Sequence, residues 1–318
     1  MLYYILDGRK NIFDGELTMN TQKKKPFYKQ GWFWGIIVVL IGIIFISTRD
    51  SENETTFEPD HDIHVFTREQ GSGTRSAFTD VAGIVNRDGD DAISLTATVQ
   101  NSTNATMQAV GGDPHAISFI SLGSLNDTVR AVPVNGVEPS TDNISSGDYK
   151  LYRNFNVMYG QELSEVAQDF WDFMFSAQAQ ELVAEDGYVQ ANPDAPEYEP
   201  SGLSGSVSIV GSTSVEPTVQ RFSEAYTDLN PDVTIDITAP GSGAGITAAV
   251  DGSADIGMSS REVSDKEAEQ LIETQPIAVD GIVVIVNNNN PIENLEMIEI
   301  QGIYQDYFTV WNEVMENE

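Results

Sequence analysis

The chain has 318 residues, of which 40% are hydrophobic and 9% aromatic, as is typical of a globular protein with room for one large domain or two lobes. Its formal net charge is -33, and residues 51–318 alone hold 9 basic and 45 acidic side chains, so nucleic acid is not expected as a partner. The absence of cysteine excludes disulfides, thiol catalysis, thiolate metal sites and a lipid-modified cysteine. The three histidines have no metal-ligand spacing, and we expect neither a metal nor a cofactor; His61 and His64, in an acidic stretch, are expected to be solvated.

Residues 1–18 have no clear pattern, but residues 23–48 have the pattern of a membrane anchor. Four lysines between residues 23 and 29 precede an apolar run over 31–48, which is long enough to cross a thin bilayer. Trp32 and Trp34 stand at its border, where indole rings favour the interface, and acidic residues follow it. We therefore predict that residues 1–30 are cytoplasmic, with Met19 as the possible true start, and that the chain after residue 48 is outside. A cleaved signal peptide is the alternative, but residues 45–50 offer no small-x-small cleavage site.

An acidic tether over residues 49–62 leads into a first folded segment, 63–190. Its predicted elements are a strand at Ile63–Phe66, a buried strand at Ala116–Ile120 and an amphipathic helical stretch at Gln161–Val183. Residues 191–204 are rich in proline and acids and form a linker.

The second folded segment, 205–318, begins with a strand at Ser206–Val210 and a helix at about Val215–Leu229, with Pro217 in its first turn. Further strands are predicted at Val233–Ile237 and, as a doubly buried strand, at Ile277–Val286. A short helix is predicted at Asp265–Ile272. Alternating strands and helices in both segments predict an α/β fold.

Four turns rich in serine, threonine and glycine join strands to helices: Thr67–Ser76, Gly211–Ser214, Gly241–Gly245 and Asp255–Arg261. Free backbone N–H groups and hydroxyls at a helix start bind small oxyanions, and Arg68 can add a forked cation. Each turn alone is also consistent with a simple helix cap. Together the four predict one dehydrated oxyanion site. The G-x-G-x-G spacing of the third turn lacks the acidic partner of a dinucleotide site, and we reject that interpretation.

These turns resemble the four ligand loops of the phosphate-binding protein of bacterial phosphate ABC importers, a resemblance that covers nearly all of residues 63–190 and 205–318. Three further stretches, Val99–Thr103, Gly147–Arg153 and Glu185–Tyr188, look like framework parts of the same family. The resemblance implies a two-lobed fold of the type II periplasmic-binding-protein class, with phosphate clamped between the lobes. Carried over position by position, it implies anion contacts from Arg68, Ser72, Gly73, Thr74, Thr213, the Ser214 amide, Ser242 and the position of Ser260.

Two positions depart from the family pattern. Some members have an aspartate where Ser260 stands, whose carboxylate accepts the phosphate proton and excludes sulfate. Gln70 stands where the family usually has an acid beside the arginine, so the restraint of Arg68 is expected to come from Glu69.

The order of the two segments is reversed relative to the family. We predict a circular permutant in which the linker 191–204 joins the old termini, and in which each lobe is assembled from both segments. A segment of a disrupted tandem gene and halves exchanged between two chains are the alternatives.

The expected function is therefore that of a membrane-anchored, extracellular solute-binding protein that captures inorganic phosphate for the permease subunits of an ABC importer. A sensing or adhesion ectodomain not coupled to transport is the alternative. An enzyme is not expected. Ser72 or Ser214 could act as a nucleophile only beside a positioned base, and the one histidine well inside a folded segment that could be such a base is His115.

Overall fold

The computed structural model describes residues 56–315, which belong to one compact unit. The predicted anchor at 31–48 and Met19 lie outside the described residues. No helix within the described part of the chain is both long and apolar enough to cross a membrane.

The two largest hydrophobic clusters of the described residues divide this unit into two lobes. The core of lobe I combines residues between Ile63 and Leu151 with residues between Ile282 and Val314. The core of lobe II combines residues between Phe155 and Met258 with Ile277 and Ala278. Each lobe is thus built from both sequence segments, and that expectation is confirmed.

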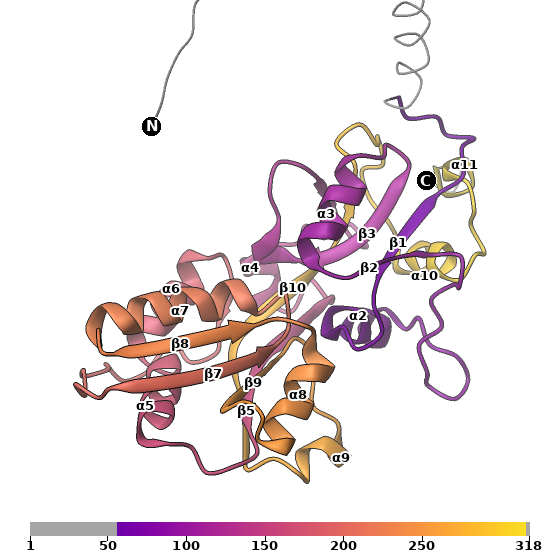
Figure 1. Ribbon diagram of the computed structural model, residues 1–318. Helices are drawn as coiled ribbons and strands as arrows, with labels where there is room; N and C mark the ends of the chain where they lie inside the picture. Colours follow the sequence, from indigo (N-terminus) through magenta and orange to yellow (C-terminus); the bar gives the residue numbers. More distant parts are fainter. Residues whose placement is uncertain (1–55, 316–318) are drawn as a thin grey trace, which may run out of the picture. The chain divides into compact units, whose positions relative to one another are not determined.

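Lobe I has parallel strands on which helices pack, followed by C-terminal helices that complete its core (Figure 1). Its elements are β1 (His64–Arg68), α2 (Gly73–Ala82), β2 (Thr98–Gln100), α3 (Thr103–Gly111), β3 (Ala116–Ser121), the 3-10 turn η2 (Leu122–Ser124), β4 (Arg130–Val132), α4 (Thr141–Ser145), α10 (Met297–Tyr304) and α11 (Trp311–Met315).

Lobe II holds the longest helix of the described residues, α7, beside two parallel strands (Figure 1). Its elements are β5 (Tyr152–Tyr159), α5 (Glu165–Met174), α6 (Ala177–Glu185), β6 (Val189–Gln190), β7 (Gly205–Gly211), α7 (Glu216–Leu229), β8 (Val233–Thr238), α8 (Ser242–Asp251), β9 (Ile256–Ser259) and α9 (Asp265–Ala268).

The strand β10 (Glu273–Val286) runs through both lobes and joins their strands into one sheet. The main path of that sheet is β2-β1-β3-β10-β5-β9-β7-β8. As far as Gly281, β10 pairs with β5 in lobe II; from Ile282 it pairs with β3 in lobe I. The chain therefore passes between the lobes at two neighbouring places, the start of β5 and the middle of β10.

Two predicted helical elements differ in extent from the observed ones. The stretch Gln161–Val183 is two helices rather than one, because Ser176 begins a new helix by accepting a hydrogen bond from the Ala179 amide at 3.3 Å. The helix expected at Asp265–Ile272 ends at Ala268. The predicted strands at Ile63–Phe66, Ala116–Ile120, Ser206–Val210, Val233–Ile237 and Ile277–Val286 are confirmed within a few residues, as is the helix that contains Pro217.

Candidate anion-binding site

Four helices direct their N-termini toward one region between the lobes: α2 and α3 from lobe I, α7 and α8 from lobe II. The side chains at or just before these helix starts contact one another across the lobes, as the distances below show. A helix N-terminus carries partial positive charge and unpaired N–H groups. Four of them at one place therefore attract an anion without a cluster of basic side chains.

Hydrogen bonds connect the lobes at this place. Arg68 Nη2 donates to Thr213 Oγ1 at 3.0 Å, and the hydroxyls of Thr74 and Ser214 lie 2.9 Å apart. The Gly243 amide donates to the Gly71 carbonyl at 3.0 Å. The lobes are therefore closed on each other in this structure, and the site is formed only when both are in place.

Gly73 is the point of closest approach between α2 and lobe II. A Cβ atom at this position would clash with Ser242 and would lie 2.6 Å from Ser260 Oγ. A glycine at position 73 is thus required by the close contact with lobe II, in addition to any use of its N–H group. With Ser72 directly before it in the chain, all eight predicted site residues lie together.

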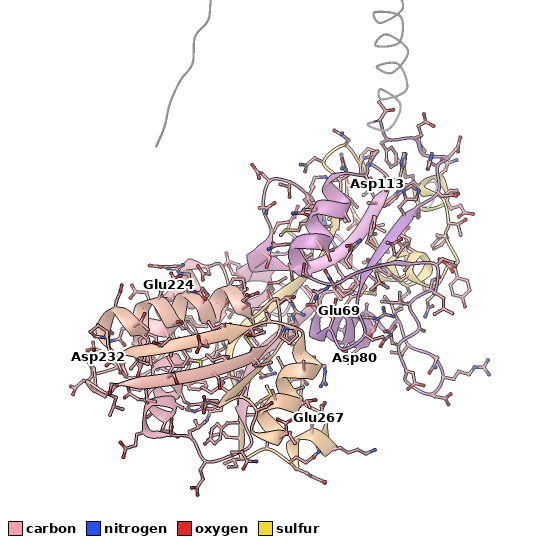
Figure 2. All side chains as sticks on the ribbon, in the orientation of Figure 1. Glu69, Asp80, Asp113, Glu224, Asp232 and Glu267 are labelled. Atoms are coloured by element: carbon pink, nitrogen blue, oxygen red, sulfur yellow. The ribbon has the colours of Figure 1, made fainter. Side chains whose placement is uncertain are left out.

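Arg68 is only 2% exposed, and its charge is balanced by its chain neighbour. Arg68 Nε donates to Glu69 Oε2, and Nη2 donates to Glu69 Oε1, each at 2.9 Å. Figure 2 shows Glu69 where the two lobes meet. The expectation that Glu69 restrains the arginine in place of Gln70, which is exposed, is confirmed. This bidentate pair uses one acceptor site on each Glu69 oxygen and pairs the carboxylate charge with that of the guanidinium.

The lobe II side of the site is a chain of buried serines. Ser212 Oγ donates to Ser260 Oγ at 2.8 Å, and the Ser260 amide donates to Ser242 Oγ at 3.1 Å. The Ser214 amide donates to Ser212 Oγ at 3.1 Å, so in this structure the Ser214 hydroxyl, rather than the amide named in the prediction, reaches lobe I. Ser214, Ser242 and Ser260 have no exposed surface. Such a dry set of hydroxyl dipoles strengthens each bond to an enclosed oxyanion.

Sequence reasoning missed Thr103. Its hydroxyl lies 3.2 Å from Ser214 Oγ and 3.4 Å from Arg68 Nη1, and the residue is 4% exposed. The family resemblance implies a framework role for the stretch that contains it, Val99–Thr103. The available signal was Ser102–Thr103 directly after a strand, since Ser102 caps α3 by accepting from the Ala105 amide at 3.1 Å.

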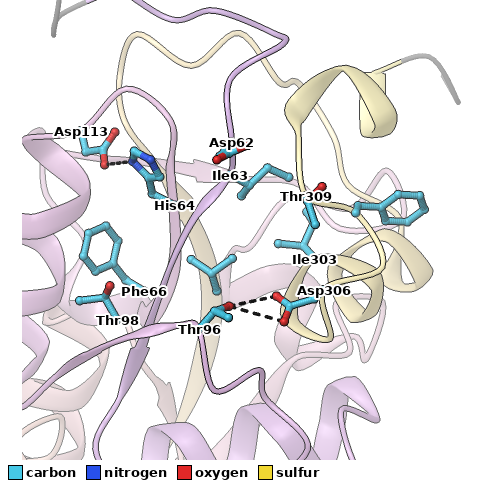
Figure 3. Close-up of a pocket in the computed structure, with 12 residues that line it drawn as sticks. Asp62, Ile63, His64, Phe66, Thr96, Thr98, Asp113, Ile303, Asp306 and Thr309 are labelled. Carbon is cyan, nitrogen blue, oxygen red and sulfur yellow. Dashed lines mark hydrogen bonds and ion pairs between the residues drawn. The ribbon is translucent and has the colours of Figure 1, made fainter.

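A hollow of about 690 Å³ opens elsewhere in lobe I, between β1 and the segment after α10 (Figure 3). Three aspartates, Asp62, Asp113 and Asp306, line it, and its lining contains neither lysine nor arginine. Such walls repel an anion, so the hollow does not compete with the four-helix site for an anionic ligand.

Comparisons with known proteins agree on one family. The model of the PBP superfamily domain matches residues 10–178 and 196–318. The phosphate-binding protein PstS 2 of Streptococcus pneumoniae (strain ATCC BAA-334 / TIGR4) is 44% identical over 255 residues, which cover 79% of this chain and 87% of that protein. The crystal structure of a phosphate-binding protein of a phosphate ABC transporter from Streptococcus pneumoniae TIGR4 has a TM-score of 0.66 at 43% identity, and covers 80% of this chain and all of the other. The phosphate-binding protein PstS of Pseudomonas aeruginosa (strain PAO1) is 34% identical over only 121 residues, 36% of this chain and 38% of that protein.

Proposed function

The chain belongs to the PBP superfamily, among the phosphate-binding proteins of phosphate ABC transporters, and from this premise we propose how its own residues hold the ligand. Inorganic phosphate is enclosed between the lobes by Arg68, Ser72, Gly73 and Thr74 of lobe I and by Thr213, Ser214, Ser242 and Ser260 of lobe II. The closed protein then presents the anion to the permease subunits of the importer.

The observation that carries this proposal is the convergence of these eight residues from the two lobes onto one buried place. Arg68 and Thr213 come from opposite lobes and are 3.0 Å apart, as Thr74 and Ser214 are at 2.9 Å. Since each lobe supplies only part of the hydrogen-bond donors, the affinity of the open form is low, and binding is coupled to closure.

Calorimetric titration of variants from each lobe tests the assignment. We expect Arg68→Met in lobe I and Ser242→Ala in lobe II each to weaken phosphate binding by about tenfold or more, the usual loss for a hydrogen bond to a charged group. Ser146→Ala, an exposed serine of lobe I, is the matched control and should leave the dissociation constant unchanged. Unchanged binding in both site variants would refute the assignment.

We further propose that the described unit lies outside the cell and is held at the membrane by residues 31–48. The basic residues before this run and the acidic residues after it support that orientation. Cell fractionation with protease treatment of intact cells tests the topology: an accessible binding unit in the membrane fraction is expected, and a freely secreted one would contradict the anchor.

The reversed order of the two segments is proposed to be a working circular permutation. One observation supports it: the Ile63 amide donates to the Thr309 carbonyl at 2.7 Å, so the predicted junction is short. The alignment with PstS 2 of Streptococcus pneumoniae runs through 87% of that protein, so this relative has the two segments in the same order and shares the proposed permutation. A chain rebuilt with residues 205–315 before residues 63–190 and a short joining loop should fold as a monomer and bind phosphate. Loss of folding in the rebuilt chain would contradict the permutation.

A further inference from the structure

We propose that Thr103 is a ninth residue of the phosphate shell, one that positions Arg68 and binds the anion through its own hydroxyl. The inference rests on the proposed function, because it assigns a role at the same site. It goes beyond the eight predicted contacts, all of which lie on the four ligand loops, whereas Thr103 lies on a fifth segment, at the first residue of α3.

The first argument is the placement of the Thr103 hydroxyl. It lies 3.4 Å from Arg68 Nη1, 3.2 Å from Ser214 Oγ and 3.5 Å from Thr213 Oγ1. One small side chain of lobe I therefore lies beside the guanidinium and beside two hydroxyls of the Gly211–Ser214 turn, those of Thr213 and Ser214. A hydroxyl can accept one hydrogen bond and donate another, so Thr103 can accept from Arg68 and still donate to a ligand oxygen.

The second argument is the donor inventory of Arg68. Its Nε is committed to Glu69, and its Nη2 is committed to Glu69 and Thr213. Among the described residues, Nη1 has a single side-chain partner, Thr103, at the long distance of 3.4 Å. A guanidinium has five N–H groups, so an N–H of Nη1 remains for a ligand, and it lies beside Thr103. Thr103 is thus adjacent to the one part of the cation that can still bind an anion.

The third argument is the rigidity of the position. Thr103 is held at the start of α3 by the Ser102 cap, and α3 packs through the buried Met107 and Val110. A hollow of about 340 Å³ beside it is lined by both Thr103 and Thr213, so the two threonines stand at the boundary between this hollow and the buried residues of the candidate site. A hydroxyl fixed at this boundary can donate a hydrogen bond to the anion in addition to those from the four ligand loops.

The test uses the full 318-residue chain, purified in mild detergent and titrated with inorganic phosphate by calorimetry. Thr103→Val keeps the shape and removes the hydroxyl, and we expect the dissociation constant to rise by about tenfold to a hundredfold. Thr103→Ser restores the hydroxyl and should stay within about threefold of the parent protein.

The matched control is Thr106→Val, the same change one turn later in α3. Thr106 is fully buried, and its hydroxyl donates to the Ser102 carbonyl at 3.0 Å, away from Arg68. We expect this variant to bind phosphate as the parent does. A smaller effect of Thr103→Val in an Arg68→Lys background than in the parent would show that the two side chains act together.

The outcomes are distinguishable. If the parent chain does not bind phosphate, the proposed function itself fails, and the role of Thr103 fails with it. If the parent binds and Thr103→Val binds equally well, or if Thr106→Val loses as much affinity, only the role of Thr103 is overturned.

Discussion

Arg153 and Asp280 form an ion pair, 2.9 Å from Nη2 to Oδ2, that is completely buried where β5 and β10 pass between the lobes. Asp280 also accepts hydrogen bonds from Ser121 Oγ at 2.8 Å and from the Leu122 amide at 3.1 Å, both in lobe I. Burial raises the pKa of the Asp280 carboxyl, and the bonds from Arg153 and Ser121 act against that shift. This pair fixes the two crossing strands to each other and to the end of β3.

We predict that Asp280→Asn destabilises the protein by about 3–5 kcal/mol, because it leaves the Arg153 charge buried without a counter-charge. Denaturant unfolding monitored by tryptophan fluorescence measures the change. Glu185→Gln is the control. It breaks an ion pair with Arg221 in which the glutamate side chain is more than half exposed, and it should lower the free energy of unfolding by about 1 kcal/mol or less. Equal effects of the two variants would contradict the structural role of the buried pair.

The fold class and the four turns of the candidate site could be predicted from local sequence signals, whereas the individual contact residues came from the family resemblance. Apolar runs indicated the strands, and Ser-Gly turns after strands indicated the helix N-termini, because both signals depend on neighbouring residues. Two features depend on contacts between distant segments: the sequence marks a helix start at Ser102 but not its place in the candidate site. Thr103 enters the site through tertiary packing of α3, and the pairing of Arg153 with Asp280 joins residues 127 positions apart.

Gly73→Ala should abolish tight phosphate binding. The added Cβ would meet Ser242 and Ser260 of the other lobe, so the closed form would be blocked while the open form is unaffected. We expect a loss of affinity of at least about a hundredfold by calorimetry, since misplacing the lobes affects several hydrogen bonds at once. Gly243→Ala is the control: its Cβ would have only ordinary contacts, 3.6 Å from Gly71, and its amide is retained. Tight binding by Gly73→Ala would show that the site does not close as described.

Sulfate should compete with phosphate in this protein. Ser260 is a hydroxyl, and the charge of Glu69 is paired with that of Arg68, so no unpaired carboxylate among the described site residues repels a fully ionised ligand. Competition titration should give a sulfate affinity within about a thousandfold of that for phosphate. A difference of this size corresponds to the loss of about two hydrogen bonds to a charged group. Ser260→Asp should weaken sulfate binding far more than phosphate binding. Complete exclusion of sulfate by the parent would overturn this explanation.

The three histidines of the chain form one cluster where residues 56–62 contact lobe I. The rings of His61 and His115 are stacked at 4.1 Å, and His64 Nδ1 lies 2.5 Å from Asp113 Oδ2. His115 Nε2 accepts a hydrogen bond from the Glu58 amide at 2.9 Å, which requires a neutral ring. The expectation that His61 and His64 are exposed is confirmed, yet both contact His115.

This cluster predicts an acid-sensitive attachment of residues 56–62. Burial lowers the pKa of His115, and the charges of His61 and His64 lower it further. The carboxylates of Asp113 and Glu58 oppose this shift but do not cancel it. Because the pKa is lowered in the attached state, the attachment is fully present above the ordinary histidine pKa of about 6.5 and is lost as the pH falls below it. Hydrogen exchange of the Glu58 amide should therefore speed up, relative to other protected amides, between about pH 6.5 and 5. His115→Phe should remove this pH dependence, and its persistence would contradict the prediction.

The most direct test of the central claim, that the closed four-helix site holds phosphate, is calorimetric titration of the full chain with inorganic phosphate. We predict one phosphate per chain with a dissociation constant in the micromolar range or below, since several hydrogen bonds converge on an enclosed anion. The absence of binding at millimolar phosphate would contradict the account.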